Sequence, residues 1–200
     1  MTSPMVLLDC VKRGLLLTSL ALVTACSSAP QPEDDWFEGG PMKPTSVRTL
    51  QMTTRVLAAK GELAAASGVA GRMLAEHPQH AESYAEAAEL LVRDGRYQDA
   101  VDVLTKGLER VPGSPVLHNN RGLCRLMLGQ LPEATVDFEA AYATDTYDSD
   151  YVANLALARA LTGDASGELD ARRLWARVLT PDLVEANLER ARSTRSKLVR

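Results

Sequence analysis

Four glycines recur in this sequence at a constant interval of 34 residues: Gly61, Gly95, Gly129 and Gly163. In the same register, an alanine follows each of the first three glycines by five residues, and a proline follows the first two by seventeen: Ala66, Ala100, Ala134, Pro78 and Pro112. A constant period of this length indicates one small structural unit, repeated so that neighbouring units cover each other's apolar faces. The chain is therefore predicted to form a repeat array.

The unit at residues 81–114 has the pattern of two helices joined by a tight turn. Tyr84 begins an apolar stripe at helical spacing, and Gly95 ends that helix because glycine readily adopts the left-handed conformation. Ala100 is small where the two helix backbones are expected to cross, and Pro112 ends the second helix. Aromatic residues make up only 4% of the chain, a balance that favours close helix packing over strands. The fold is predicted to be all-α.

This pattern resembles the tetratricopeptide repeat. The matching positions are Tyr84, Ala87, Ala88, Leu91, Gly95, Tyr97, Ala100, Leu104 and Pro112. Weaker copies occupy residues 47–80, 115–148 and 149–182, and the third copy has Arg121 and Arg125 where apolar residues are usual. The resemblance implies a solenoid of about four helix hairpins over residues 47–182.

The fourth copy departs from the pattern after Gly163. Glu168 falls where the crossing alanine is expected, and a carboxylate is costly to bury without a partner. If three residues are inserted after Gly163, Ala171 becomes the crossing alanine, and Trp175 and Val178 become packing residues. We predict that insertion.

Residues 183–200 are predicted to form a capping helix and a basic tail, since repeat arrays need a terminal element with a polar outer face. The helix is expected to start at Thr180 and Pro181, and Val184 and Leu188 belong to its apolar stripe. Its basic residues either extend into solvent or bind an acidic surface: Arg190, Arg192, Arg195, Lys197 and Arg200.

The N-terminus has the pattern of a secretion signal over residues 1–25. Lys12 and Arg13 precede an apolar stretch at 14–23 that is too short to span a bilayer comfortably. The four residues ending at Cys26 resemble the lipobox of bacterial lipoproteins, which implies cleavage before Cys26 and fatty acyl chains on it. The alternative is an ordinary signal peptide that happens to contain a cysteine.

Residues 26–46 are predicted to be a flexible linker, because they hold four prolines and two adjacent glycines without periodicity. Ser27 follows the cysteine and resembles a sorting signal for the outer membrane. The expected location is therefore the cell envelope, lipid-anchored and facing the periplasm. Trp36 and Phe37 either dock on the first helix of the array, contact a partner, or stay in solvent.

Several function classes are disfavoured. The net charge of −4, without a basic run in the repeats, argues against nucleic acid as a partner. His77, His80 and His118 lack metal-ligand spacing to a second His or Cys, and no glycine-rich phosphate loop is present. Cys124 is expected to be a buried packing residue, with a redox role as the alternative. No enzyme activity, cofactor, metal or small-molecule substrate is predicted.

The resemblance implies a concave groove lined by the first helix of each hairpin. Its N-terminal half would carry Arg48, Gln51, Arg55, Glu82, Glu86, Glu89 and Arg93, and its C-terminal half Asn119, Asn120, Leu123, Leu126, Met127, Asn154, Leu157 and Leu161. A protein or peptide is predicted to bind in the second half, because amides pair with an extended backbone and Leu and Met accept apolar side chains. Alternatively, these apolar residues pack on the capping helix.

The chain is thus expected to be a membrane-anchored adaptor that assists assembly of a pilus, secretion or envelope complex. Residues 119–122 and 154–156 resemble the small tetratricopeptide lipoproteins of tight-adherence and type IV pilus systems. The alternative function is an accessory or regulator of a cell-wall enzyme, with the convex face or Trp36 and Phe37 making the contact.

Overall fold

The computed structural model describes residues 45–198, which form nine α-helices and no strand. The helices are α1 (Val47–Ala59), α2 (Leu63–Glu76), α3 (Ala81–Arg93), α4 (Tyr97–Arg110), α5 (Pro115–Met127), α6 (Leu131–Thr144), α7 (Ser149–Thr162), α8 (Ala165–Trp175) and α9 (Pro181–Leu198). The prediction of an all-α fold is confirmed. The predicted signal peptide, Cys26, Trp36 and Phe37 lie outside the described residues.

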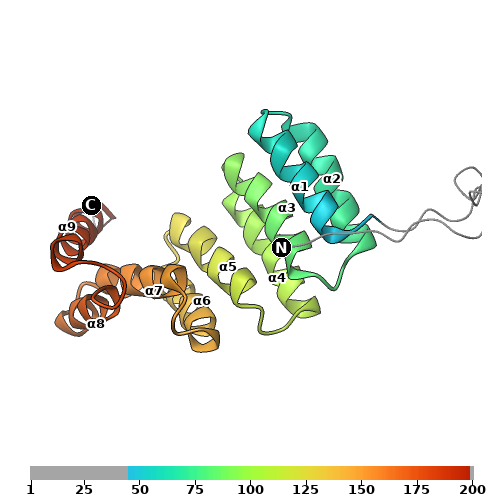
Figure 1. The fold of residues 1–200 in the computed structure, drawn as a ribbon. Helices are drawn as coiled ribbons and strands as arrows, with labels where there is room; N and C mark the ends of the chain where they lie inside the picture. The colour runs from blue at the N-terminus through green and yellow to red at the C-terminus, as the bar shows by residue number, and fades with distance from the viewer. Residues whose placement is uncertain (1–44, 199–200) are drawn as a thin grey trace, which may run out of the picture. The chain divides into compact units, whose positions relative to one another are not determined.

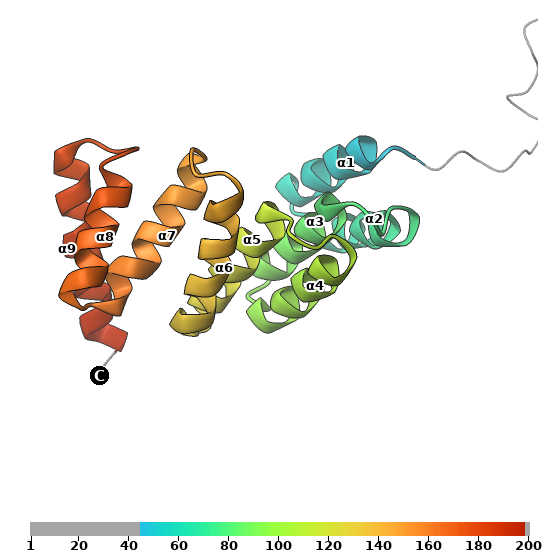
Figure 2. The same ribbon diagram turned by 90° about the horizontal axis from the view of Figure 1, so that it is seen from below.

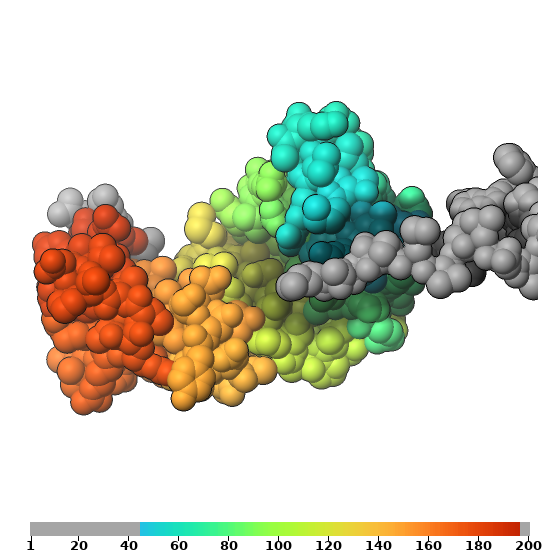
Figure 3. Space-filling model, in the orientation of Figure 1, coloured from blue at the N-terminus to red at the C-terminus, as the bar shows by residue number. Residues whose placement is uncertain are grey.

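Helices α1 to α8 pack in consecutive pairs, and each pair is a hairpin. The first helix of each hairpin also contacts the first helix of the next, so that α1, α3, α5 and α7 form a row that α9 continues. Figures 1 and 2 show the hairpins following one another in chain order. In the space-filling view, α9 covers the last hairpin at the C-terminal end of this row (Figure 3).

The four glycines that recur every 34 residues lie in the turn between the two helices of each hairpin. Gly61, Gly95, Gly129 and Gly163 have φ angles of 81°, 72°, 76° and 74°. These angles lie in the left-handed region, which residues with a Cβ enter only at a cost. Side-chain caps begin the next hairpins, because Ser114 accepts from the backbone N–H of Leu117 and Asp148 from that of Tyr151.

The helix crossings are filled by alanine. Ala66, Ala100 and Ala134 are all buried where the two helices of their hairpins meet. In the fourth hairpin Ala171 and Trp175 of α8 are both buried, as the predicted insertion requires.

The three extra residues of the fourth hairpin belong to the beginning of α8. This helix starts two residues after Gly163, the same offset as in the other hairpins, so the loop is not longer. Glu168 instead lies on the side of α8 that meets α9, where it pairs with Arg192 at 2.6 Å. Val178 lies beyond the end of α8 at Trp175, so its predicted place on that helix is wrong.

The capping helix α9 buries Val184, Leu188 and Ala191. They join one apolar cluster with Trp175 of α8 and Ala156 of α7. By covering the apolar face of the last hairpin, which would otherwise be exposed to water, α9 stabilises the C-terminal end of the array.

The third hairpin contains a buried ionic network at the place where its sequence departs from the repeat pattern. Asp137 of α6 is only 1% exposed, and Arg121 and Arg125 of α5 each approach one of its carboxylate oxygens to 2.7 Å. His118 Nδ1 lies 3.2 Å from the same carboxylate, and Arg121 also donates to the hydroxyl of Thr105 at 3.2 Å. The two arginines are therefore tolerated between the helices because a buried carboxylate pairs with both.

Candidate protein-binding groove

Three adjoining pockets lie along the row of first helices. The first, of about 280 Å³, lies between α1, α3 and α5; the second, of about 220 Å³, lies between α3 and α5. The third, of about 510 Å³, is lined by α5, α7, α9 and Trp175 of α8. Glu89 and Asn120 line both the first and the second pocket, and Met127 lines both the second and the third. The pockets therefore form one continuous surface, the inner groove.

Most charges of the N-terminal half of the groove are already paired within the protein. Glu86 is buried and accepts from Gln51 Nε2 at 2.8 Å and from Arg55 Nη2 at 2.7 Å. The hydrogen bond and the charge of Glu86 raise the pKa of Arg55 above its ordinary value. Arg93 pairs with Glu89 at 2.8 Å. These four predicted site residues therefore meet in two ion pairs.

Two of the three asparagines predicted for the ligand-binding half, Asn119 and Asn154, are instead bonded to each other. Asn154 Nδ2 donates to Asn119 Oδ1 at 2.8 Å, between α7 and α5. Asn119 is buried and lines none of the three pockets, whereas Asn154 is half-buried and lines the third. The Asn119 side chain thus joins adjacent hairpins, a role that the spacing of the repeats did not indicate.

A hydrogen bond between the first helices of adjacent hairpins occurs at the first and the third junction of the array, and it is missing at the middle junction. Gln51 bonds to Glu86 and Asn154 to Asn119, each pair 35 residues apart. The equivalent pair at the middle junction is Ala85 and Asn120, and a methyl group cannot bond to an amide. Asn120 therefore has no side-chain partner among the described residues. Its half-buried amide faces the first two pockets, free to bond to a ligand's main chain.

The apolar residues of the C-terminal half divide between two roles. Leu161 is buried, and Leu157 packs with it against the cluster that includes α9. Leu123 and Met127 are exposed beside the second pocket. The alternative prediction of packing on the capping helix therefore holds for the two leucines of α7 and for Leu126 of α5, which packs against the same cluster. It does not hold for Leu123 and Met127.

Cys124 lies in the wall of the second pocket, and its side chain is buried. Burial raises the pKa of its thiol, which reduces the fraction of reactive thiolate at neutral pH. The arrangement agrees with a packing role for this residue. Within residues 45–198, no group of three or more His, Cys, Asp or Glu is placed to hold a metal ion, and no helix is long and apolar enough to cross a membrane.

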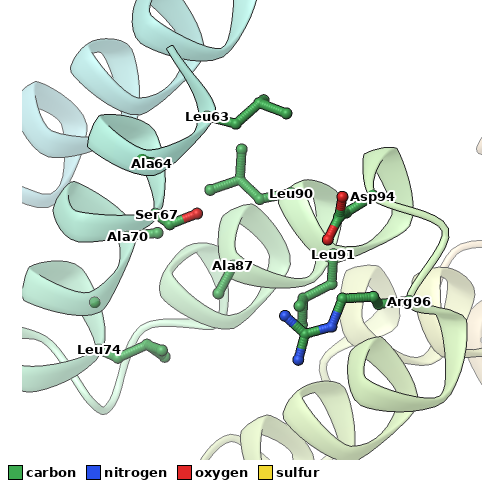
Figure 4. Close-up of a pocket in the computed structure, with 11 residues that line it drawn as sticks. Leu63, Ala64, Ser67, Ala70, Leu74, Ala87, Leu90, Leu91, Asp94 and Arg96 are labelled. Carbon is green, nitrogen blue, oxygen red and sulfur yellow. The ribbon is translucent and has the colours of Figure 1, made fainter. Parts of the chain in front are cut away.

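A separate cleft of about 350 Å³ lies between α2 and α3 and shares no residue with the inner groove. Figure 4 shows Ser67 of α2 pointing into this space, which Ala64 and Ala70 of the same helix also line. Its charged residues are Asp94 and Arg96, and Arg96 pairs with Asp99 at 2.6 Å. The cleft is a gap left by the small side chains of α2.

Comparison with known proteins supports the repeat architecture. Residues 57–123 match the family model of the tetratricopeptide repeat. The chain is similar to a thermophilic tetratricopeptide protein of Thermus thermophilus, with 19% identity, coverage of 76% of this chain and 82% of that one, and a TM-score of 0.60. It is also similar to MamA from Desulfovibrio magneticus RS-1, with 19% identity, coverage of 66% and 77%, and a TM-score of 0.53.

A further similar structure holds a bound peptide. It is the first tetratricopeptide domain of Spaghetti (RPAP3) bound to an HSP90 peptide, with 14% identity, coverage of 61% of this chain and 97% of that one, and a TM-score of 0.54. At these identities the likeness concerns the fold, which for the described residues is an all-α solenoid of tetratricopeptide type.

Proposed function

We propose that this protein is a membrane-anchored scaffold that holds a protein partner in the inner groove, during assembly of a pilus, secretion or envelope complex. The observation that carries the proposal is the middle of the groove, where the free amide of Asn120 lies beside exposed Leu123 and Met127. An amide and an apolar surface together can bind the backbone and the side chains of one peptide segment. Solenoids of this kind commonly bind proteins on such extended surfaces.

A crosslinking experiment in the producing cells tests the groove. Met127 and Val136 are equally exposed, at 62% and 63%, but Val136 lies on α6 and lines none of the pockets. A photo-crosslinking amino acid at position 127 is expected to yield a discrete protein adduct, and one at 136 is not. An adduct from 136 alone would contradict binding in the groove and favour a contact through the second helices.

A second variant tests the role of Asn120 directly. Ala85→Gln restores the side chain type that bonds across the first junction, where Gln51 donates to Glu86. The new amide is expected to pair with Asn120 and to weaken the adduct from position 127. Ala143→Gln is the matched control, because Ala143 is exposed on α6 and lines none of the pockets. Equal adduct yields from both variants would remove Asn120 from the binding site.

The membrane anchor of the proposal rests on the N-terminal sequence. Lipidation of Cys26 would hold the protein in the cell envelope, with the outer membrane and its periplasmic face as the proposed location, because two or more acyl chains bind a bilayer stably. Cys26→Ser is expected to move the protein from the membrane fraction to the soluble fraction. Cys124→Ser is the control and should leave the distribution unchanged. A Cys26→Ser protein that stays with the membrane would refute the anchor.

A further inference from the structure

One arginine of the C-terminal half differs from its neighbours. Within the described residues, the other arginines of α7, α8, α9 and the turn between α8 and α9 have polar partners in the protein. The pairs are Arg159 with Glu139, Arg172 with Glu185, Arg173 with Asp170, Arg177 with Tyr142 and Thr146, Arg192 with Glu168, and Arg195 with the carbonyl of Gly163. Arg190 has no such partner and lines the third pocket of the inner groove.

The surroundings of Arg190 leave its charge uncompensated. Asn154, Asn187 and Thr194 are the other polar side chains of the third pocket, and all three are neutral. No carboxylate lines this pocket, in contrast to the first pocket with Glu82, Glu86 and Glu89. The remaining lining is apolar: Leu126, Met127, Ala153, Leu157, Leu161, Trp175 and Ala191. Arg190 is therefore the one charged residue in the lining of this pocket, and the other lining residues are neutral and mostly apolar.

We propose that the third pocket binds an acidic-apolar peptide segment, in which an Asp or Glu side chain pairs with Arg190 and an adjacent apolar side chain lies on Leu157 and Trp175. This assignment rests on the proposed function and specifies the chemistry of its partner. An arginine presents a planar set of donors that matches one carboxylate, and charge-assisted hydrogen bonds of this kind are among the stronger ones. Arg190 is exposed in the free protein, and the apolar side chain of a bound peptide would reduce the screening of the pair by water and so strengthen the attraction.

The path of the groove supports a segment of chain as the occupant. The third pocket continues into the second through Met127, and the second reaches Asn120. A ligand with its acidic side chain at Arg190 can therefore extend toward Asn120, where its backbone meets the free amide. The capping helix α9 covers the last hairpin. In this arrangement it also supplies Arg190, which selects the ligand.

Selection from a displayed library of random 12-residue peptides on the immobilised full-length chain tests the assignment. The enriched peptides are expected to carry Asp or Glu next to Leu, Ile, Met or Phe. Arg190→Glu should weaken the best peptide by about tenfold or more, the loss of one charged hydrogen bond. A peptide with Lys in place of its acid should bind Arg190→Glu better than it binds the wild type. Arg173→Glu is the matched control, since this 71% exposed side chain lies outside the pocket and the charge change is the same.

The possible failures separate the inference from the function. Enriched peptides without an acid, or equal affinities for Arg190→Glu and Arg173→Glu, would overturn the assignment of Arg190 and leave the groove as the binding face. Loss of binding when the peptide C-terminus is amidated would identify a terminal carboxylate and overturn the choice of an acidic side chain. A library that yields no binder would count against both the inference and peptide binding in the groove.

Discussion

The second and third hairpins share the 34-residue plan but fill the space between their helices with opposite chemistry. In α3–α4 the interior positions are apolar: Tyr84, Ala87, Leu91 and Val103. The equivalent positions of α5–α6 are the members of the ionic network: His118, Arg121, Arg125 and Asp137. Both hairpins have the same helix lengths and the same turn. The same hairpin backbone therefore accommodates either apolar or ionic interior side chains, provided that these side chains complement one another within the hairpin.

The same two hairpins also place their large and small side chains at different positions. Gly122 lies against Phe138, whereas the second hairpin has Ala88 and Leu104 at the equivalent positions. Conversely, Gly107 makes room for Tyr84, and a Cβ added there would lie 2.7 Å from the tyrosine ring. Each large side chain is thus matched by a glycine on the opposite helix. The comparison indicates that charge and volume are balanced hairpin by hairpin.

Removing the centre of the ionic network should have the largest effect. Asp137→Ala leaves two partly buried arginines without their carboxylate, and we expect a loss of about 3 kcal/mol in the free energy of unfolding, measured by denaturant titration with circular dichroism. Transplanting the apolar set is the control: Tyr, Ala, Leu and Val at positions 118, 121, 125 and 137, with Ala141→Gly to admit the tyrosine. That variant should regain most of the loss, and a variant as unstable as Asp137→Ala would show that the two fillings are not interchangeable.

The volume balance predicts the next largest effect. Gly122→Ala places a Cβ 2.7 Å from the Phe138 ring, and overpacking of this kind costs about 1–3 kcal/mol. Adding Phe138→Leu recreates the alanine and leucine pair of the second hairpin. The double variant should be more stable than Gly122→Ala, although Phe138→Leu alone is destabilising. Additive losses in this double-mutant cycle would show that the two residues are not coupled.

The turns should respond equally in the two hairpins. Gly95→Ala and Gly129→Ala each force a residue with a Cβ into a left-handed conformation, with φ of 72° and 76°. The expected loss is about 1 kcal/mol for each, because the strain is partly offset by a less flexible unfolded chain. Thermal unfolding of both variants measures it. Clearly different stability losses for the two variants would mean that the interior side chains, and not only the turns, control the hairpin geometry.

The smallest effect is expected for a charge pair on the surface. Arg93→Ala removes the pair with Glu89, whose side chains are both about half exposed. Such pairs contribute about 0.5 kcal/mol or less, and salt screens them. Denaturant titration at low and high salt should show a small loss that nearly disappears at high salt. A loss as large as that of Asp137→Ala would contradict the distinction between buried and exposed ion pairs.

The sequence was sufficient for the parts of the fold that depend on local chemistry. Glycines at a constant interval predicted the turns, and alanines predicted the helix crossings, because each signal acts within one hairpin. Even the irregular fourth hairpin followed from the cost of burying Glu168, since the packing of Ala171 and Trp175 agrees with the predicted shift. Val178 was misplaced because the end of α8 depends on how the chain turns into α9.

The partners of polar side chains required the tertiary structure. The two arginines of α5 are visible as exceptions in the repeat pattern, but a carboxylate on the next helix explains them only once the two helices are packed. The sequence did hold one indication of this carboxylate: Asp137 occupies the position that Val103 occupies one repeat earlier. The asparagines gave no comparable signal, because any amide on a groove-facing helix could bind a ligand or a neighbouring hairpin.

By itself, then, the sequence determined a row of helix hairpins with a cap, because steric rules for glycine, alanine and proline act over a few residues. Only the tertiary structure decided which polar groups remain available: Asn119 is bonded to Asn154, while Asn120 and Arg190 are without side-chain partners among the described residues. The physical reason is that the hydrogen bonds between hairpins depend on distances of a few ångströms between residues 35 positions apart. Those distances are set by how one hairpin stacks on the next.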